Sequence, residues 1–318
     1  ASLKEAVAER DRLSAALFQV RDALLASTSW RLTSPIRVLG QQWRNIRFVV
    51  KTLPAVLKIG GGVTGTLKKA WQVTRKEGWR GIKHRILHAA GQDPLARGYA
   101  EWIRRYDTLG DVGRAGILRR IVKMQYKPLI SVVMPVYNPP IDLLDHAIGS
   151  VRNQLYFHWE LCIADEASTN HEVQALLRRH AAEEPRVKVV FRSVNGHISR
   201  ASNSAIELAT GEYIALLDHD DLLPVHALFC VAETINQHPA AGIIYSDEDK
   251  VDIAGNRRDP YFKCDWNPDL FLSHNMISHL GVYRADLLRQ VGGFREGFEG
   301  SQDYDLALRL SARTSAIQ

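Results

Sequence analysis

The sequence predicts an α/β fold, a mostly parallel β-sheet with helices on both faces, preceded by an α-helical extension. Helical patterns alone precede Lys127-Pro128, whereas apolar runs of strand length alternate with helical segments after it. Such alternation is typical of parallel sheets built from βαβ units. The charge also changes sign, because residues 1–130 carry 25 Lys and Arg against 9 Asp and Glu, and the remainder carries 16 against 26. The main domain is therefore placed at 127–318.

Residues 1–28 predict an amphipathic helix, because the positions of its seam alternate spacings of three and four over residues 2–26. These positions are Leu3, Ala6, Arg10, Leu13, Leu17, Val20 and Leu24. The heptad seam predicts a coiled coil through which the protein forms oligomers, although a helix packed on its own domain explains it equally well. The pattern runs from the first residue, so we expect the chain to be a fragment of a longer protein.

Residues 29–126 predict a basic helical extension. The stretch 31–91 holds 13 Lys and Arg and a single acid, Glu77, with Trp71 and Trp79 among the cations. This mixture is typical of helices that lie on an anionic membrane surface, although a solvated basic face explains it equally well. No recognisable motif supports nucleic-acid binding, so no nucleic-acid partner is expected.

Cysteine usage and hydropathy indicate a location. The three cysteines, Cys162, Cys230 and Cys264, lie far apart and form no CxxC pair, which suggests a reducing compartment. No apolar run has the roughly 18 residues that a membrane-spanning helix needs, and no signal peptide is visible. We expect a cytoplasmic protein that associates peripherally with the inner face of the cytoplasmic membrane.

Five strands and four connecting helices are predicted within the main domain. The strands span 129–134, 159–164, 187–191, 212–217 and 241–245, and the helices lie near 141–153, 170–183, 199–209 and 224–237. The carboxyl ends of parallel strands share one edge of the sheet, where ligands bind. Polar residues follow the first, second and fourth strands at 135–138, 165–166 and 218–221, so we expect them to gather at that edge.

The acidic cluster Asp218-His219-Asp220-Asp221 follows the apolar run of the fourth strand. Carboxylates at the end of a buried strand repel one another and lose hydration, a cost that a bound divalent cation offsets. Oxygen ligands with no nearby cysteine favour Mg²⁺ or Mn²⁺, which leave coordination positions for substrate phosphates. An Asp-rich helix cap is the alternative, but the neighbouring polar strand ends favour a metal site.

Five short motifs in order carry a resemblance to a known family. They are SVVMPVYN at 131–138, ADEAST at 164–169, NG with SRASN over 195–203, ATGEYIALLDHDD at 209–221, and GGF followed by GSQDYDL over 292–306. With these motifs, residues 129–312 resemble family 2 glycosyltransferases of the Rossmann-like GT-A fold. Such enzymes bind a nucleotide sugar across the strand ends and transfer the sugar with inversion. The neighbouring features are similar to bacterial enzymes that build cell-surface polysaccharide.

The resemblance implies roles at the nucleotide pocket. Pro135 and Tyr137 would line it, with the tyrosine ring facing the base. Asp165 would accept a hydrogen bond from the base or ribose, Arg200 would reach the base or diphosphate, and Asn203 would support the pocket. A surface helix turn for Arg200 and Asn203, and a packing role for Tyr137, stay open.

The same resemblance implies the metal ligands. Asp220 would bind the metal directly, and Asp218 would hold the ribose or a metal-bound water, or share the metal. Asp221 is expected to cap the next helix and His219 to have no role. His279 is a weaker candidate for a residue that approaches the metal.

Asp303 would be the catalytic base, which takes the proton of an acceptor hydroxyl as that oxygen attacks the anomeric carbon. Asp305 is an alternative base, and both residues could merely cap the helix over 304–312. On the acceptor side we place Asp247, Trp266 and Asp305. A solvated acidic loop for Asp247 and core packing for Trp266 are equally good explanations.

We therefore predict a hexosyl- or deoxyhexosyltransferase of EC class 2.4, with a nucleoside-diphosphate sugar, UDP-linked first of all, as donor. The acceptor would be a hydroxyl of a glycan or lipid-linked molecule in O-antigen or capsule synthesis. Two features depart from the family: Glu166 stands where a second Asp is usual, and the chain ends at Gln318, so we expect a truncated domain. A nucleotidyltransferase is the first alternative, but Asn138-Pro139-Pro140 lacks a phosphate-cradling loop. A non-catalytic module for scaffolding or sugar binding is the second.

Overall fold

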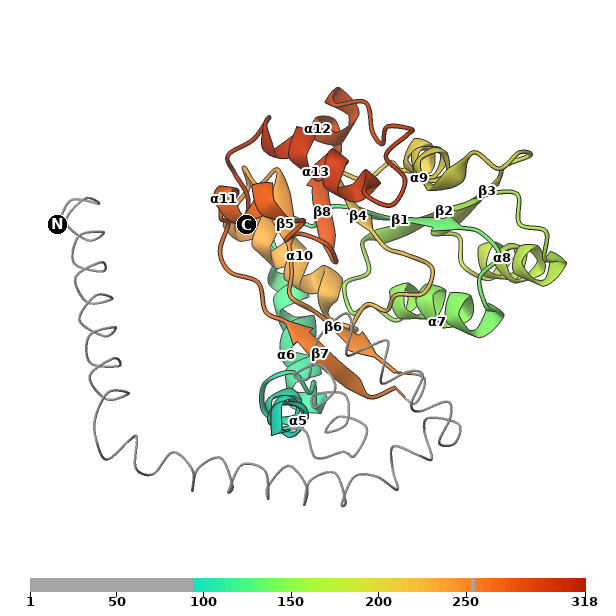
Figure 1. The fold of residues 1–318 in the computed structure, drawn as a ribbon. Coiled ribbons are helices and arrows are strands. Elements are labelled where there is room, and N and C mark those ends of the chain that lie inside the picture. The colour runs from blue at the N-terminus through green and yellow to red at the C-terminus, as the bar shows by residue number, and fades with distance from the viewer. Residues whose placement is uncertain (1–93, 253–254) are drawn as a thin grey trace, which may run out of the picture. The chain divides into compact units, whose positions relative to one another are not determined.

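The computed structural model describes residues 94–252 and 255–318, with side chains from residue 98 onward. A compact unit spans Ala100–Gln318 (Figure 1). The predicted coiled coil over 2–26 and the basic segment 31–91 lie outside the described residues. Within the described part of the chain, no helix is long and apolar enough to cross a bilayer.

A six-stranded sheet forms the centre of the compact unit, with the strand order β3-β2-β1-β4-β8-β5. Four strands pair in parallel: β1 (Ile130–Val136), β2 (Trp159–Asp165), β3 (Val187–Phe191) and β4 (Tyr213–Leu216). β8 (Gly281–Arg284) pairs antiparallel with both β4 and β5 (Ile243–Tyr245). The five predicted strands are confirmed, but β8 was not predicted, because four residues give no clear alternation.

Helices cover both faces of the sheet, as predicted (Figure 1). One face packs against α6 (Asp111–Lys123), α7 (Ile141–Arg152), α8 (His171–Glu183) and α10 (Ala227–Gln237). The other face packs against α9 (His197–Leu208), α11 (Pro268–Ser273), α12 (Ala285–Gln290) and α13 (Gln302–Ser311). α5 (Pro94–Tyr106) precedes α6, and β6 (Glu248–Val251) pairs with β7 (Arg257–Tyr261) as a separate hairpin.

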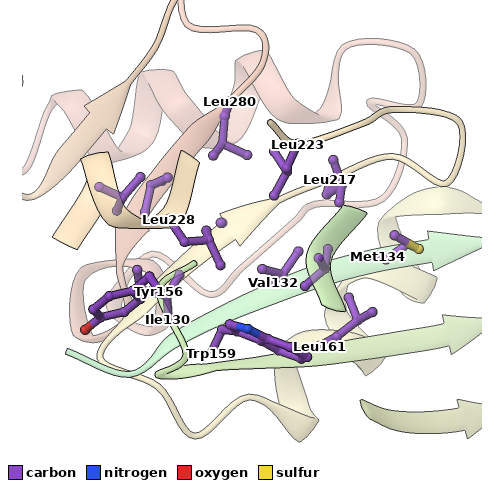
Figure 2. Close-up of a cluster of buried hydrophobic side chains, with 14 of the residues drawn as sticks. Ile130, Val132, Met134, Tyr156, Trp159, Leu161, Leu217, Leu223, Leu228 and Leu280 are labelled. Carbon is purple, nitrogen blue, oxygen red and sulfur yellow. The ribbon is translucent and has the colours of Figure 1, made fainter. Parts of the chain in front are cut away.

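The alternation of side chains along β1 and β2 explains the two cores. Val132 and Leu161 face the first core, whereas their chain neighbours Val133 and Cys162 face the second. This is the period of two that a strand imposes, and a sheet buried on both faces needs apolar residues at every position. Figure 2 shows the first core, in which Val132 and Leu161 lie among Trp159, Leu217 and other apolar side chains.

One buried carboxylate belongs to the fold itself. Glu160, in the second position of β2, accepts hydrogen bonds from Ser131 Oγ and Lys188 Nζ, each at 2.6 Å, and from the Thr210 amide at 2.6 Å. Burial alone raises the pKa of this carboxyl, but the hydrogen bonds outweigh burial and hold the pKa at about 2. The group lies where the parallel strands begin, at the edge opposite their carboxyl ends.

Candidate active site

The loops after β1 and β2 are tied together at the carboxyl edge of the sheet. Asn138, with a left-handed φ of 46°, accepts hydrogen bonds on its side-chain oxygen from the amides of Thr169 (2.9 Å) and Asn170 (3.1 Å). Its own amide donates to Ser168 Oγ at 2.9 Å. This fixed turn leaves the ring of Tyr137 49% exposed beside it, so the ring can stack on a planar ligand.

Asp165 ends β2 with a fully buried side chain. Its Oδ2 accepts a hydrogen bond from the Ser168 amide at 3.3 Å, whereas Oδ1 receives none from the described residues. A buried acceptor without a donor is costly. A ligand that offers an N–H or O–H group would satisfy it.

Glu166, which follows Asp165, has a structural role instead. Its Oε2 lies 2.8 Å from Arg192 Nε, and its Oε1 accepts the Gly196 amide hydrogen bond. The longer side chain therefore reaches across to the loop that leads into α9. This explains how a glutamate serves where the family usually has a second aspartate.

Arg200 and Asn203, both on α9, contact the loop before α13. Arg200 pairs with Glu296 at 2.7 Å. Asn203 binds the Phe294 backbone twice, as acceptor at 2.9 Å and as donor at 2.8 Å. A Cβ at Gly293 (φ +68°) would lie 2.5 Å from Asn203 Oδ1. Glycine at this position therefore lets the backbone of the loop approach the Asn203 side chain. The predicted contact of Arg200 with the nucleotide would compete with its ion pair.

The structure brings Asp218, Asp221 and His279 together, with one ligand atom of each within 4.8 Å of the others. His279 Nδ1 lies 3.6 Å from Asp221 Oδ2. Burial raises the pKa of Asp218 and of Asp221, His279 opposes this increase, and the charge of Asp220 adds to it. Burial and mutual repulsion thus disfavour the charged form of two neighbouring carboxylates, a cost that a bound cation would relieve.

Two predictions about this cluster need correction or refinement. Asp221 does not cap the next helix, because α10 begins only at Ala227, with His226 at its N-cap. The prediction was wrong because residues 217–226 form a loop rather than the start of the helix. Asp220, predicted as the direct metal ligand, is exposed and lies outside the group of three, although its charge acts on both neighbours.

His279 enters the cluster because of β8. An antiparallel strand beside β4 begins where β4 ends, and the register pairs Ala215 with Val282. The loop before β8 therefore lies at the carboxyl edge of β4, next to Asp218. His219 turns to the Pro135 carbonyl, with Nδ1 at 3.3 Å from that oxygen.

Asp303, the second residue of α13, lies outside this group of three but acts on it electrostatically. Its charge contributes to the raised pKa of Asp218, so the two carboxylates share one electrostatic environment. Asn275 Nδ2 donates a hydrogen bond to Asp303 Oδ2 at 2.7 Å. A single segment, residues 275–279, therefore contacts the predicted base at one end and the acidic cluster at the other.

Comparison with known proteins identifies the family. Residues 131–292, just over half of the chain, match the sequence model described as glycosyl transferase family 2. The chain belongs to this family. Asp303 lies beyond the matched residues.

Two curated relatives are similar in sequence to this family 2 glycosyltransferase. The uncharacterized protein y4gI of Sinorhizobium fredii is 60% identical over 205 residues, 64% of this chain and 23% of its own length. O-antigen biosynthesis protein RfbC of Myxococcus xanthus is 40% identical over 197 residues, 62% of this chain and 16% of its own length. The chain thus spans less than a quarter of either relative.

The fold agrees with the crystal structure of S. aureus TarS 1–349 in complex with UDP-GlcNAc. The TM-score is 0.50 at 20% sequence identity, and the match covers 59% of this chain and 54% of that chain. This likeness supports the GT-A assignment that the motifs predicted.

Asp305, Trp266 and Asp247 were predicted on the acceptor side, and each has a different environment in the structure. Asp305 is buried and paired with Arg295 and Arg309. Burial raises the pKa of Asp305, but the hydrogen bonds from the two arginines outweigh it and lower the pKa overall. Its carboxylate is therefore occupied, which argues against it as a base in this glycosyltransferase. Trp266 packs on Phe271 with ring centroids 4.8 Å apart.

Asp247, the third of these residues, lies in the exposed turn before β6 and accepts the Lys263 amide hydrogen bond at 2.6 Å. His279 was a weaker candidate in the sequence, and the contact of Asn275 with Asp303 was not predicted. Their positions beside these acids depend on β8, a short strand whose pairing the sequence does not reveal.

Proposed function

We propose that this chain is the nucleotide-sugar transferase domain of a longer protein, and that it transfers a hexosyl or deoxyhexosyl group to an acceptor hydroxyl with inversion. One observation carries the proposal. A member of glycosyl transferase family 2 brings Asp218, Asp221 and His279 together at the carboxyl edge of its sheet, where the charge of Asp303 also acts on Asp218. Ligands of open α/β sheets bind at this edge.

The donor pocket is proposed at Tyr137 and Asp165. The exposed tyrosine ring would stack on the base. The free Oδ1 of Asp165 would accept the ring N–H that uracil and guanine both carry. A UDP-sugar is the donor to test first, as the sequence predicted.

The residues of the acidic cluster fit a divalent cation. Two carboxylates and one imidazole offer ligand atoms close together, and the raised pKa values of Asp218 and Asp221 express the repulsion that a cation would relieve. The imidazole nitrogen favours Mn²⁺ over Mg²⁺, because Mg²⁺ prefers oxygen ligands. When bound, such an ion neutralises charge on the departing nucleoside diphosphate. Asp220, at the exposed rim, would add a further carboxylate.

Asp303 would act as the base. Asn275 holds Oδ2, so the other carboxylate oxygen stays available for the acceptor hydroxyl. The hydroxyl proton moves to Asp303 while the acceptor oxygen bonds to the anomeric carbon and the bond from that carbon to the phosphate oxygen breaks. Attack from the face opposite the leaving group inverts the anomeric configuration.

The acceptor is proposed to be a glycan or lipid-linked hydroxyl of a surface polysaccharide. The similarity to an O-antigen biosynthesis protein supports this class, as do the sequence features described above. Asp247 and Trp266 stay predictions for the acceptor side. Oligomerisation through residues 2–26 and membrane association through 31–91 also stay predictions.

The test is release of nucleoside diphosphate from candidate donors, with and without Mn²⁺, with a polysaccharide precursor as acceptor. Asp303→Asn should lower kcat by about a hundredfold or more, as expected for loss of a general base, while donor binding is retained. Asp286→Asn is the matched control, because Asp286 also lies in the first turn of a helix but at the opposite end of β8. Pyrophosphate release would indicate a nucleotidyltransferase, and binding without any release would indicate a non-catalytic module.

A further inference from the structure

Lys263, two residues after β7, is a buried cation with no role in the chemistry described above. Its side chain is 1% exposed. The ammonium group donates to the carbonyl oxygens of Ile277 and His279, each at 2.6 Å, and to Glu248 Oε2 at 3.1 Å. All three N–H donors of a lysine are thus used, and two of them bind the main chain of one short segment.

Glu248, the first residue of β6, binds the same segment. Its Oε2 accepts the His279 amide hydrogen bond at 2.8 Å. The next amide, that of Leu280, donates to Ser246 Oγ at 3.2 Å. His279 is therefore held at both of its peptide groups, the N–H by Glu248 and the carbonyl by Lys263.

The hairpin also fixes Lys263 in turn. The Lys263 amide donates to Asp247 Oδ1 at 2.6 Å, so the chain before β6 and the chain after β7 are joined. The Lys263–Glu248 ion pair therefore connects the β6–β7 hairpin to the main chain of Ile277 and His279. On the ring of His279, Nδ1 lies 3.6 Å from Asp221 Oδ2.

We propose that the Lys263–Glu248 ion pair is a positioning device that sets the place of His279 in the acidic cluster. The proposal rests on the proposed function in one respect, that His279 is taken as a metal ligand. A buried ion pair usually contributes little net stability, because the cost of desolvating both charges offsets their attraction. Here its hydrogen bonds fix the main chain that presents a ligand, and partners behind a ligand of this kind control metal affinity.

The experiment compares Mn²⁺ affinity, measured by calorimetry, in the wild-type chain, Lys263→Met, His279→Ala and the double variant. Lys263→Met should weaken Mn²⁺ binding roughly ten- to a hundredfold. In the His279→Ala background the same change should have less than about a twofold effect, because the coupling is lost with the histidine. An effect as large in that background as in the wild type would overturn the proposal.

A second readout needs no metal. Hydrogen exchange of the peptide that contains residues 277–280 should be faster in metal-free Lys263→Met than in the wild type. Unchanged exchange there would overturn the proposal. If the wild type bound no Mn²⁺, the metal site of the proposed function would fail, whereas this exchange comparison would still decide the positioning role.

The chain offers a matched control and a milder variant. Lys188→Met breaks another lysine–glutamate pair, Lys188–Glu160, at the far edge of the sheet, and should leave Mn²⁺ affinity and exchange of 277–280 unchanged. Glu248→Gln keeps an acceptor for the His279 amide but removes the ion pair. It should lower Mn²⁺ affinity less than Lys263→Met does, and it decides the question if the lysine variant does not fold.

Discussion

Buried carboxylates at the two edges of the sheet have pKa values shifted in opposite directions. At the edge where the parallel strands begin, Glu160 is surrounded by donors, which hold its pKa at about 2. At the edge where they end, Asp218 and Asp221 lie close to each other and to Asp220, the charge of Asp303 also acts on Asp218, and the pKa values of Asp218 and Asp221 are raised. No side-chain or backbone donor among the described residues hydrogen-bonds the carboxylate of Asp218.

We interpret the difference as that between a carboxylate that supports the fold and carboxylates that can bind a ligand. A buried acid that serves structure is neutralised within the chain, because each unpaired acceptor would cost stability. A buried acid that serves binding is left unneutralised, so that the ligand supplies the missing charge. Such sites lower the stability of the free protein in exchange for function.

The largest effect on activity is expected at the edge where the parallel strands end. Asp218→Asn should lower Mn²⁺-dependent transfer on the order of a hundred- to a thousandfold, as for other losses of fixed electrostatic stabilisation. The same change should leave the metal-free protein as stable as the wild type or more stable, because it removes a repelled charge. Kinetics and urea unfolding would be measured on one preparation. A large loss of stability would mean that Asp218 supports the fold as Glu160 does, and would contradict the comparison of the two edges.

At the edge where the parallel strands begin, we expect a loss of stability without a loss of catalysis. Glu160→Ala removes the acceptor of the Thr210 amide and the carboxylate partner of the Lys188 ammonium, which keeps, among the residues that the structure describes, only the Leu208 carbonyl at 3.3 Å. It should lower the free energy of unfolding by about 2 kcal/mol, as for a buried donor that loses its acceptor, with kcat unchanged in the folded protein. A fall in kcat with intact stability would contradict the assignment.

Asn275 should show a smaller effect on catalysis. Asn275→Ala removes the hydrogen bond to Asp303 Oδ2, and a hydrogen bond to a charged group is worth roughly a tenfold change in rate. We expect kcat to fall by about that factor, with KM for the donor little changed. Asn236→Ala, on α10 and bonded to the Tyr126 backbone, serves as the control. Equal effects of the two variants would mean that Asn275 acts through stability alone.

The pH dependence of stability should differ in sign between the edges. Glu160 has a folded pKa below its usual value of 4.5, so its contribution is complete above that value and is lost as the pH falls toward about 2. The difference in unfolding free energy between the wild type and Glu160→Gln should therefore shrink in acid.

Asp218 has a raised folded pKa, so its charge destabilises the metal-free protein at neutral pH. That cost disappears as the pH falls toward the usual range of an aspartate. The stability gained in Asp218→Asn should therefore also disappear in acid. A gain that persisted unchanged at low pH would show that charge is not its cause.

Much of this molecule follows from local sequence. The apolar runs of β1 to β5 and the polar residues at their ends predicted the sheet, its two helical layers and the position of Asp218, because the carboxyl ends of parallel strands share an edge. Asp165 and Tyr137 were placed for the same reason. The exposure of Asp220 and the position of Asp221 beside Asp218 and His279 depend on the path of a ten-residue loop, which no periodicity encodes.

The remaining site residues depend on long-range pairing. His279 and Asn275 reach the site because β8 inserts antiparallel between β4 and β5, and a four-residue strand does not reveal its partners. Asp305 was the alternative base in the sequence, and Arg295 and Arg309 pair with its carboxylate. Arginines elsewhere in the chain or on the next helical turn therefore decide which of the two acids lacks an ion-pair partner within the described ranges.

The binding of UDP with and without Mn²⁺ tests the central claim most directly. If the unneutralised carboxylates hold a cation that in turn holds the diphosphate, calorimetry should show UDP affinity at least about tenfold higher with Mn²⁺ in the wild type, consistent with metal-assisted phosphate binding. Asp218→Asn should lose that gain. Equal UDP affinity with and without Mn²⁺ in the wild type would contradict the account.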